Sequence, residues 1–256
     1  MPRIVVFDSD PAEVNAHKRK HYGESTGEAY AAAIREIDAD CEITIVCPYD
    51  GETCADLTAV DGAAFTGSAV GWNTDDARAT PLAQAMRYVF AASLPTFGSC
   101  NGMQLAASVL GGASQASPQG REDGLARNIR LTEAGRTHPM MAGRKDGFAV
   151  PCVHRDEVVH LPDGAVVLAG NTHSAVQAMA YERDGIRFWG VQYHPEYTLP
   201  FIGQRVLDWG RLHADIADDL KVADQEPEAA ARLGVRFDDM QTDMRQTELR
   251  NWLSSL

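Results

Sequence analysis

The sequence lacks the features that would place it in a membrane or in an oxidising compartment. It has no uninterrupted apolar run of about 18 residues, the length that a membrane-spanning helix needs. The apolar run near the N-terminus, IVVF, is too short for the core of a signal peptide. The five cysteines are scattered and form no CxxC pair, which argues against a zinc ribbon or a redox dithiol. We therefore expect a cytoplasmic protein with free thiols and without a metal or cofactor.

Basic residues are also scarce. The chain has 23 Lys and Arg against 36 Asp and Glu, a formal net charge of -13. Such a charge disfavours binding to nucleic acid or to an anionic membrane surface. Hydrophobic residues make up 45% of the 256 residues, which is enough for a sizeable core. The length suits one large domain, or one domain with an appendage.

Strand and helix patterns alternate along residues 1–112. This alternation predicts a parallel sheet with helices on both faces. Ser25 followed by Glu28 is a capping-box pattern, which marks the start of one helix. The expected strands are 3–8, 41–48, 62–68 and 95–99, and the expected helices are 25–38, 81–94 and 102–110.

The pattern changes after residue 112. Residues 125–193 hold several β-rich runs with turn residues between them, and these runs look more antiparallel than parallel. A helix is expected at about 199–213. The segment HKRKHYGE, 17–24, carries His17 and His21 four residues apart. A metal site is one interpretation, but no further ligand cluster is evident, so a solvated basic loop is favoured.

The composition shifts again near residue 214. We predict a domain over 1–213, followed over 214–256 by an acidic linker and a helical C-terminal extension. The sparse apolar residues of the extension could form a docking stripe. We favour packing of this stripe on its own domain or across a dimer, with contact to a partner protein as the alternative.

A single cysteine occupies a strand-to-helix corner in the segment PTFGSCNGMQ. Cys100 lies between Gly98 and Gly102, and a helix is predicted directly after it. A nucleophile at such a corner projects above the sheet and lies near a helix N-terminus, where the dipole favours a thiolate. Free backbone N–H groups there can bind an oxyanion. The corner is typically strained, so small neighbours are needed. The alternative is a buried cysteine beside a glycine turn.

The segment FWGVQYHPE offers a base for this nucleophile. Pro195 ends the strand, and His194 precedes it in an extended conformation. In an extended chain, residues two apart point to the same side, so His194 and Glu196 would lie together. A carboxylate beside an imidazole fixes its tautomer and stabilises the imidazolium. A surface turn is the alternative for HPE alone, but together with the corner cysteine it predicts a Cys–His–Glu triad.

These segments, GSCNGMQ and QYHPE, resemble the two signature motifs of class I glutamine amidotransferases, in the same order and at a similar separation. FTGSAV, 65–70, resembles the glycine turn that forms part of the oxyanion hole. VHRDEV, 153–158, partly resembles the segment that lines the glutamine site in GMP synthase-type domains. The resemblance covers about residues 60–200 and implies a flavodoxin-like mixed, mostly parallel sheet with an antiparallel portion.

The resemblance implies a role for each matched residue. Cys100 would attack the side-chain amide of glutamine, His194 would move the proton, and Glu196 would hold His194. The products would be glutamate and ammonia, formed through a thioester. Backbone N–H groups would stabilise the oxyanion, and three side chains would help to bind glutamine. The oxyanion residues implied are Asn101, Gly67 and Ser68, and the substrate-binding residues implied are Gln104, His154 and Asp156.

Two departures from the family pattern stand out. Ser68 and Ala69 replace the second glycine and the proline of the usual oxyanion turn, which leaves the backbone donors intact. Val153 replaces the usual serine, which puts the contacts to the α-amino and carboxylate groups of the substrate in question.

The sequence leaves the substrate open. With no synthetase domain in the chain, the amidase would either feed ammonia to a separate synthetase subunit or hydrolyse a γ-glutamyl amine or peptide with the same triad. A homodimer is also compatible with the sequence. An α/β-hydrolase is disfavoured because its acid normally comes from another strand. An intact triad argues against a catalytically silent scaffold.

Overall fold

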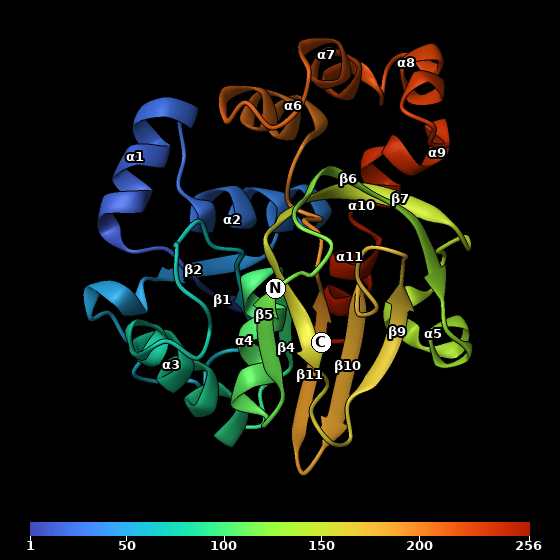
Figure 1. The fold of residues 1–256 in the computed structure, drawn as a ribbon. Helices are drawn as coiled ribbons and strands as arrows, with labels where there is room; N and C mark the ends of the chain where they lie inside the picture. The colour runs from blue at the N-terminus through green and yellow to red at the C-terminus, as the bar shows by residue number, and fades with distance from the viewer.

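The computed structural model describes residues 1–256 and contains a nine-stranded sheet flanked by helices (Figure 1). The strand order is β2-β1-β3-β4-β11-β10-β9-β6-β7. Pairing is parallel from β2 to β11 and antiparallel from β11 to β7, which confirms a mixed sheet with an antiparallel portion. The strands are β1 (Arg3–Phe7), β2 (Glu42–Val46), β3 (Gly62–Phe65), β4 (Thr96–Ser99), β6 (Glu122–Leu131), β7 (Phe148–His154), β9 (Val166–Gly170), β10 (Ala178–Arg183) and β11 (Ile186–Val191). A separate antiparallel pair joins β5 (Ala113–Ala116) to β8 (Asp156–His160).

Helices cover both faces of the sheet. Alternate residues of β1 belong to two different hydrophobic clusters, as the two-residue period of a strand requires. Ile4 lies in the cluster beneath α2 (Thr26–Ile37) and α11 (Thr247–Leu253). Phe7 lies in the cluster beneath α3 (Thr80–Ala91) and α4 (Asn101–Val109). The remaining helices are α1 (Ala12–Tyr22), α5 (Glu133–Thr137), α6 (Leu199–Asp208), α7 (Ala214–Val222), α8 (Pro227–Arg232), α9 (Phe237–Met240) and α10 (Thr242–Arg245), with 3-10 turns at Pro48–Asp50, Ala77–Ala79 and Pro139–Met141.

The expected capping box is present at the start of α2. The Ser25 hydroxyl accepts from the Glu28 N–H at 3.2 Å, and the Glu28 carboxylate accepts from the Ser25 N–H at 2.6 Å. The helix expected at 199–213 ends earlier, because α6 stops at Asp208 and Gly210 follows with a positive φ of 62°.

The prediction of a loop over 17–24 is wrong. These residues fall mainly in α1, which ends at Gly23 with a φ of 88° and a bond from the Gly23 N–H to the Arg19 carbonyl. The helix buries only Asn15 and Lys18, so it has no apolar stripe for sequence periodicity to detect. A buried ion pair between Lys18 and Asp10 joins it to the loop after β1 instead.

The C-terminal segment is helical and packs on the rest of the chain. Helix α7, which contains much of the acidic run, packs on α6 through a cluster that includes Leu220 and Val206. In α11, Trp252 is buried with its ring 5.8 Å from that of Phe97. The division into 1–213 and 214–256 stays a prediction. None of the helices combines the length and apolarity that crossing a membrane requires.

Candidate active site

The predicted nucleophile and base follow two neighbouring strands of the parallel half of the sheet. Ser99 at the end of β4 pairs with Val191 at the end of β11. Cys100 comes directly after the first strand, and His194 follows the second by three residues. Gly67 follows β3, which pairs with β4 on its other side. Their loops therefore meet at the carboxyl edge of the sheet, where open α/β folds bind ligands.

The corner at Cys100 is strained and tightly packed. Cys100 has φ 50° and ψ -105°, a conformation that L residues rarely adopt, and its N–H donates to the Val191 carbonyl at 2.8 Å. A Cβ at Gly98 would lie 2.7 Å from the carbonyl carbon of Gly102, and one at Gly102 would lie 2.3 Å from the Phe65 oxygen. Both flanking glycines are therefore required by backbone contacts.

His194 and Glu196 form a buried pair beside this corner. The His194 Nδ1 lies 2.7 Å from the Glu196 Oε1. Burial lowers the pKa of His194, but the Glu196 charge and the Cys100 thiol outweigh it and raise that pKa to about 10. The Val153 carbonyl oxygen lies 3.4 Å from the His194 Nε2 and 3.9 Å from the Cys100 Sγ. The ring of Tyr197 stacks on that of His194 at 4.2 Å. This arrangement favours an imidazolium next to the sulfur.

The expected oxyanion turn packs directly against this pair. A Cβ at Gly67 would lie 2.5 Å from the His194 Cε1 and 3.6 Å from the Cys100 Cβ. The next residues are held by Asp10, whose Oδ1 accepts from the Ser68 hydroxyl at 2.9 Å and the Ala69 N–H at 2.7 Å. The N–H groups of Gly67, Ser68 and Asn101 donate to no group of the protein. These three donors remain available for a substrate oxygen.

Sequence reasoning missed the contribution of Asp10. This carboxylate is fully buried, pairs with Lys18 and accepts from the Thr26 hydroxyl at 2.7 Å. Burial raises the pKa of Asp10, but Lys18 reverses that effect and leaves it below its ordinary value. The pKa of the neighbouring Asp8 is raised, by burial first and then by the Asp10 charge. The sequence does show two acids, Asp8 and Asp10, directly after a buried strand in the segment FDSD, and this pattern could have indicated a functional carboxylate.

The three residues expected to bind substrate line the cleft, but most of their polar side-chain atoms are already engaged within the protein. The Gln104 amide donates to the Asp156 carbonyl at 2.7 Å and to Gln192 Oε1 at 3.2 Å. Asp156 accepts two bonds from Arg155, at 2.7 and 2.9 Å. The His154 ring reaches the Asp156 carbonyl at 3.0 Å. Gln104 and His154 therefore both stabilise the β7–β8 turn, through hydrogen bonds to the Asp156 carbonyl.

His154 also belongs to the one cluster with metal-ligand chemistry. Its Nε2 lies 2.9 Å from the Glu122 carboxylate, and His173 completes a group whose ligand atoms lie within 4.8 Å of one another. However, Glu122 also accepts from Asn171 and Gln177, each at 2.7 Å. Three side chains thus bond to this carboxylate, so the cluster is a hydrogen-bond network within the protein.

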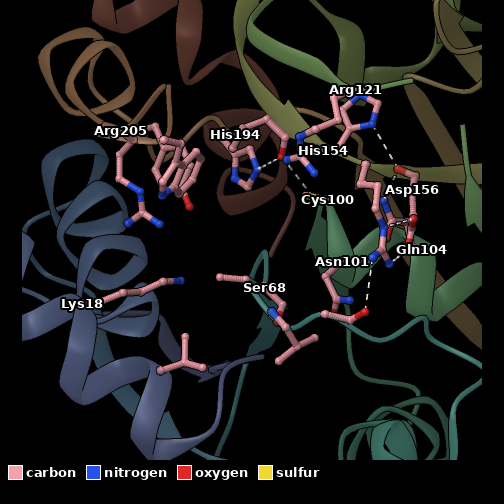
Figure 2. Close-up of a pocket in the computed structure, with 18 of the residues that line it drawn as sticks. Lys18, Ser68, Cys100, Asn101, Gln104, Arg121, His154, Asp156, His194 and Arg205 are labelled. Carbon is pink, nitrogen blue, oxygen red and sulfur yellow. Dashed lines mark hydrogen bonds and ion pairs between the residues drawn. The ribbon is translucent and has the colours of Figure 1, made fainter. Parts of the chain in front are cut away.

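A cleft of about 530 Å³ opens above Cys100 and His194. Figure 2 shows Arg205 and Lys18 on one side of these residues and His154, Asp156 and Gln104 on the other. The cleft is bounded by α1, the turn after Gly67, the β7–β8 turn and α6. It has room for a small molecule that reaches both sides of the sulfur.

The contact at Gly67 gives a prediction. Gly67→Ala should lower kcat by on the order of 10²-fold, because the new Cβ must displace the His194 ring that it would touch at 2.5 Å. Steady-state kinetics would measure the loss, with Gly71→Ala as the matched control, since a Cβ there meets no atom within 4 Å. Equal activity of both variants would contradict the tight packing of this turn on the imidazole.

Residues 21–213 match the family model described as "Glutamine amidotransferase class-I". A gamma-glutamyl-L-1-hydroxyisopropylamide hydrolase from a Pseudomonas species is 34% identical over 205 residues, which cover 77% of this chain and 68% of the relative. The GMP synthase [glutamine-hydrolyzing] of Nitrosomonas eutropha is 32% identical over 225 residues. This match covers 84% of the chain but only 40% of that enzyme.

Solved structures of similar shape span nearly the whole chain. A glutamine amidotransferase from Thermotoga maritima has a TM-score of 0.68 at 17% identity and covers 99% of this chain and 97% of its own. A glutamine amido transferase from Methylobacillus flagellatus has a TM-score of 0.64 at 20% identity. The match covers 100% of this chain and 95% of that protein. These likenesses establish the fold, including the α/β architecture expected from the sequence.

Proposed function

The chain belongs to the class I glutamine amidotransferase family, and from this premise we propose that it hydrolyses a γ-glutamyl amide through a thioester on Cys100. The observation that carries the proposal is the strained corner at Cys100 beside the buried pair of His194 and Glu196. A cysteine nucleophile needs an adjacent base, and the base needs a third group to orient it.

The first half-reaction forms the thioester. The His194 imidazolium holds the proton of the catalytic pair before the attack, and the Cys100 Sγ then attacks the carbonyl carbon of the γ-amide. Glu196 accepts the bond from the Nδ1–H, which keeps the Nε2 directed at the reacting atoms. The tetrahedral oxygen accepts hydrogen bonds from the unpaired N–H groups of Asn101 and of the turn at Gly67 and Ser68. His194 then donates its proton to the nitrogen, the C–N bond breaks, and the amine leaves.

The second half-reaction releases glutamate. Water attacks the thioester carbonyl, and His194 takes the water proton. The C–S bond then breaks, Cys100 is regenerated and the γ-carboxylate of glutamate leaves. The sum is hydrolysis of one amide by one water, with no other reactant.

Glutamine and substituted γ-glutamyl amides present the same scissile carbonyl, and hydrolysis of either fits the family. The GMP synthases are described as glutamine-hydrolyzing, and this chain spans only part of their length. A separate synthetase subunit that accepts ammonia is therefore one candidate partner. The match to an amide hydrolase over 68% of its length favours the substituted amides.

An assay of product release tests the proposal. Glutamate formation should be measured with glutamine and with a panel of γ-glutamyl amines and peptides, and intact-mass spectrometry after rapid acid quench should detect a glutamyl group on Cys100. Glutamate from at least one of these amides, dependent on Cys100, supports the proposal. No turnover of any of them, or turnover that is unchanged without the thiol, would refute it.

Glu196→Gln gives a pH-dependent prediction. Because Glu196 raises the pKa of His194, its charge stabilises the folded state below the unfolded pKa of about 6.5, and this contribution disappears as the pH rises toward about 10. The stability deficit of the variant should therefore be larger at pH 6 than at pH 10, and kcat should fall by at least about 10²-fold. Urea unfolding at both pH values measures this, with exposed Glu228→Gln as control. A deficit that grows with pH would contradict the assigned charge pairing.

A further inference from the structure

Arg205 is a buried cation at the wall of the cleft. Its residue is only 5% exposed, although it lines the cavity above Cys100. Three aromatic rings surround the guanidinium carbon, at 4.3 Å for Tyr22, 4.6 Å for Trp209 and 5.2 Å for Phe201. Burying a charge in such surroundings is costly unless an opposite charge or strong hydrogen bonds compensate it.

The other lysine and arginine side chains of the cleft all have a carboxylate partner. The Arg205 guanidinium makes neither a hydrogen bond nor an ion pair with the protein, whereas the backbone carbonyl of this residue accepts a bond from the Trp209 N–H at 3.1 Å. The chain has 36 acidic residues, so acids are not scarce. The paired cations are Lys18 with Asp10, Arg121 and Arg211 with Asp123, and Arg155 with Asp156. Arg205 is thus the one cleft lysine or arginine with no carboxylate within ion-pair distance, whereas Arg121 and Arg211 share the carboxylate of Asp123.

The position of Arg205 points to the leaving group. Tyr197 stacks on His194, the residue that protonates the departing nitrogen, and its ring lies 4.7 Å from that of Phe201, which contacts Arg205. Figure 2 places Arg205 across His194 from His154 and Asp156, the side on which the glutamyl group is expected. A group bound at Arg205 therefore extends from the amine side of the scissile bond.

We infer that the leaving amine carries a carboxylate that Arg205 binds, so that the substrate is the γ-glutamyl amide of an amino acid. The inference rests on the proposed function and specifies its substrate. The guanidinium fork matches a carboxylate with two parallel hydrogen bonds, and one cation matches one negative charge. The rings of Tyr22 and Trp209 provide an apolar wall for the methylenes between nitrogen and carboxylate. Hydrolysis then yields glutamate and the free amino acid, with the C–N bond broken and water consumed.

A matched set of substrates tests this inference. The γ-glutamyl amides of ω-amino acids, from glycine upward in chain length, are each compared with the carboxamide in which the carboxylate is replaced by a neutral amide. The wild type should favour at least one carboxylate over its carboxamide by about 100-fold in kcat/KM, the effect of a charge-assisted hydrogen bond. Arg205→Met should remove this preference and change turnover of glutamine by less than about threefold, and Arg205→Lys should keep part of the preference.

Arg211→Met separates a specific contact from general positive charge. Arg211 lies over the same Trp209 ring, at 4.2 Å, but is paired with Asp123. If the charge of the cleft as a whole sets the preference, this variant loses it too, and the inference fails. Equal losses on all substrates for Arg205→Met, with an unchanged melting temperature, would mean that Arg205 binds the glutamyl group and would also overturn it. If Arg205→Met does not fold, two measurements still test the inference. These are the preference of the wild type for carboxylate over carboxamide substrates and the partial preference expected of Arg205→Lys.

The failure of this inference differs from the failure of the proposed function. A wild type that hydrolyses carboxylates and carboxamides equally, with turnover dependent on Cys100, refutes the carboxylate subsite and leaves γ-glutamyl hydrolysis intact. A wild type that hydrolyses no γ-glutamyl amide refutes both.

Discussion

Cys100→Ala should lower kcat/KM for γ-glutamyl amide hydrolysis by about 10⁴-fold or more. Without the sulfur no thioester can form, and only the oxyanion donors and substrate binding remain to accelerate direct attack by water. Alanine keeps the backbone N–H that donates to the Val191 carbonyl, so the corner should persist. Glutamate release measured over long incubations, with purified variant free of wild-type enzyme, would quantify the loss.

A second cysteine provides the matched control for this variant. Cys54 is half-buried and does not line the cleft, so Cys54→Ser should leave kcat/KM within about twofold. An electrophile that mimics glutamine should label Cys100 in the wild type and in Cys54→Ser alike. Residual activity of Cys100→Ala within tenfold of the wild type would show that another group initiates the reaction.

The features of this site that the sequence could predict are local ones. The spacing of Gly98, Cys100 and Gly102 indicates a corner. The backbone lies so close to both glycines that neither position has room for a side chain. The proximity of His194 to Glu196 follows from extended geometry before a proline. The alternation of strands and helices over 1–112 likewise depends on periodicity and turn residues, which are read one segment at a time.

Features that depend on distant partners escaped prediction. The Asp10 carboxylate accepts a hydrogen bond from Ser68, which lies 58 residues further along the chain. No local sequence pattern predicts such a bond. Helix α1 has no apolar stripe, and it is joined to the rest of the protein through the buried ion pair of Lys18 with Asp10. Arg205 shows its importance only when the partners of every other cation in the cleft are known. Tertiary contacts of polar groups, rather than hydrophobic patterning, account for these omissions.

The same reasoning applies to the C-terminal segment, where a buried ion pair joins α11 to the turn after Met141. The Arg144 guanidinium forms two bonds with the Glu248 carboxylate, at 2.6 and 2.7 Å, and both side chains are fully buried. Burial lowers the pKa of Arg144, but Glu248 outweighs that effect and raises it above the ordinary value. The pair therefore keeps both groups charged within the core.

Glu248→Ala should lower the free energy of unfolding by about 3–5 kcal/mol, because it leaves the Arg144 charge buried without its partner. In a chain of this size that loss corresponds to a melting temperature lower by on the order of 10 °C. Urea unfolding and thermal melts measure it. Asp243→Ala is the control, since Asp243 pairs with Arg250 at 3.0 Å on the surface and should contribute less than about 0.5 kcal/mol.

A double variant separates the cost of an unpaired charge from the value of the pair. Arg144→Met combined with Glu248→Leu removes both charges and retains apolar volume, so most of the lost stability should return. If Glu248→Ala were no more destabilising than Asp243→Ala, the buried pair would contribute no more to stability than an ion pair on the surface does. A large loss that the double variant repairs would instead make residues 247–253 part of the core on which the Cys100 corner is built, because Trp252 of the same helix packs on Phe97 of β4.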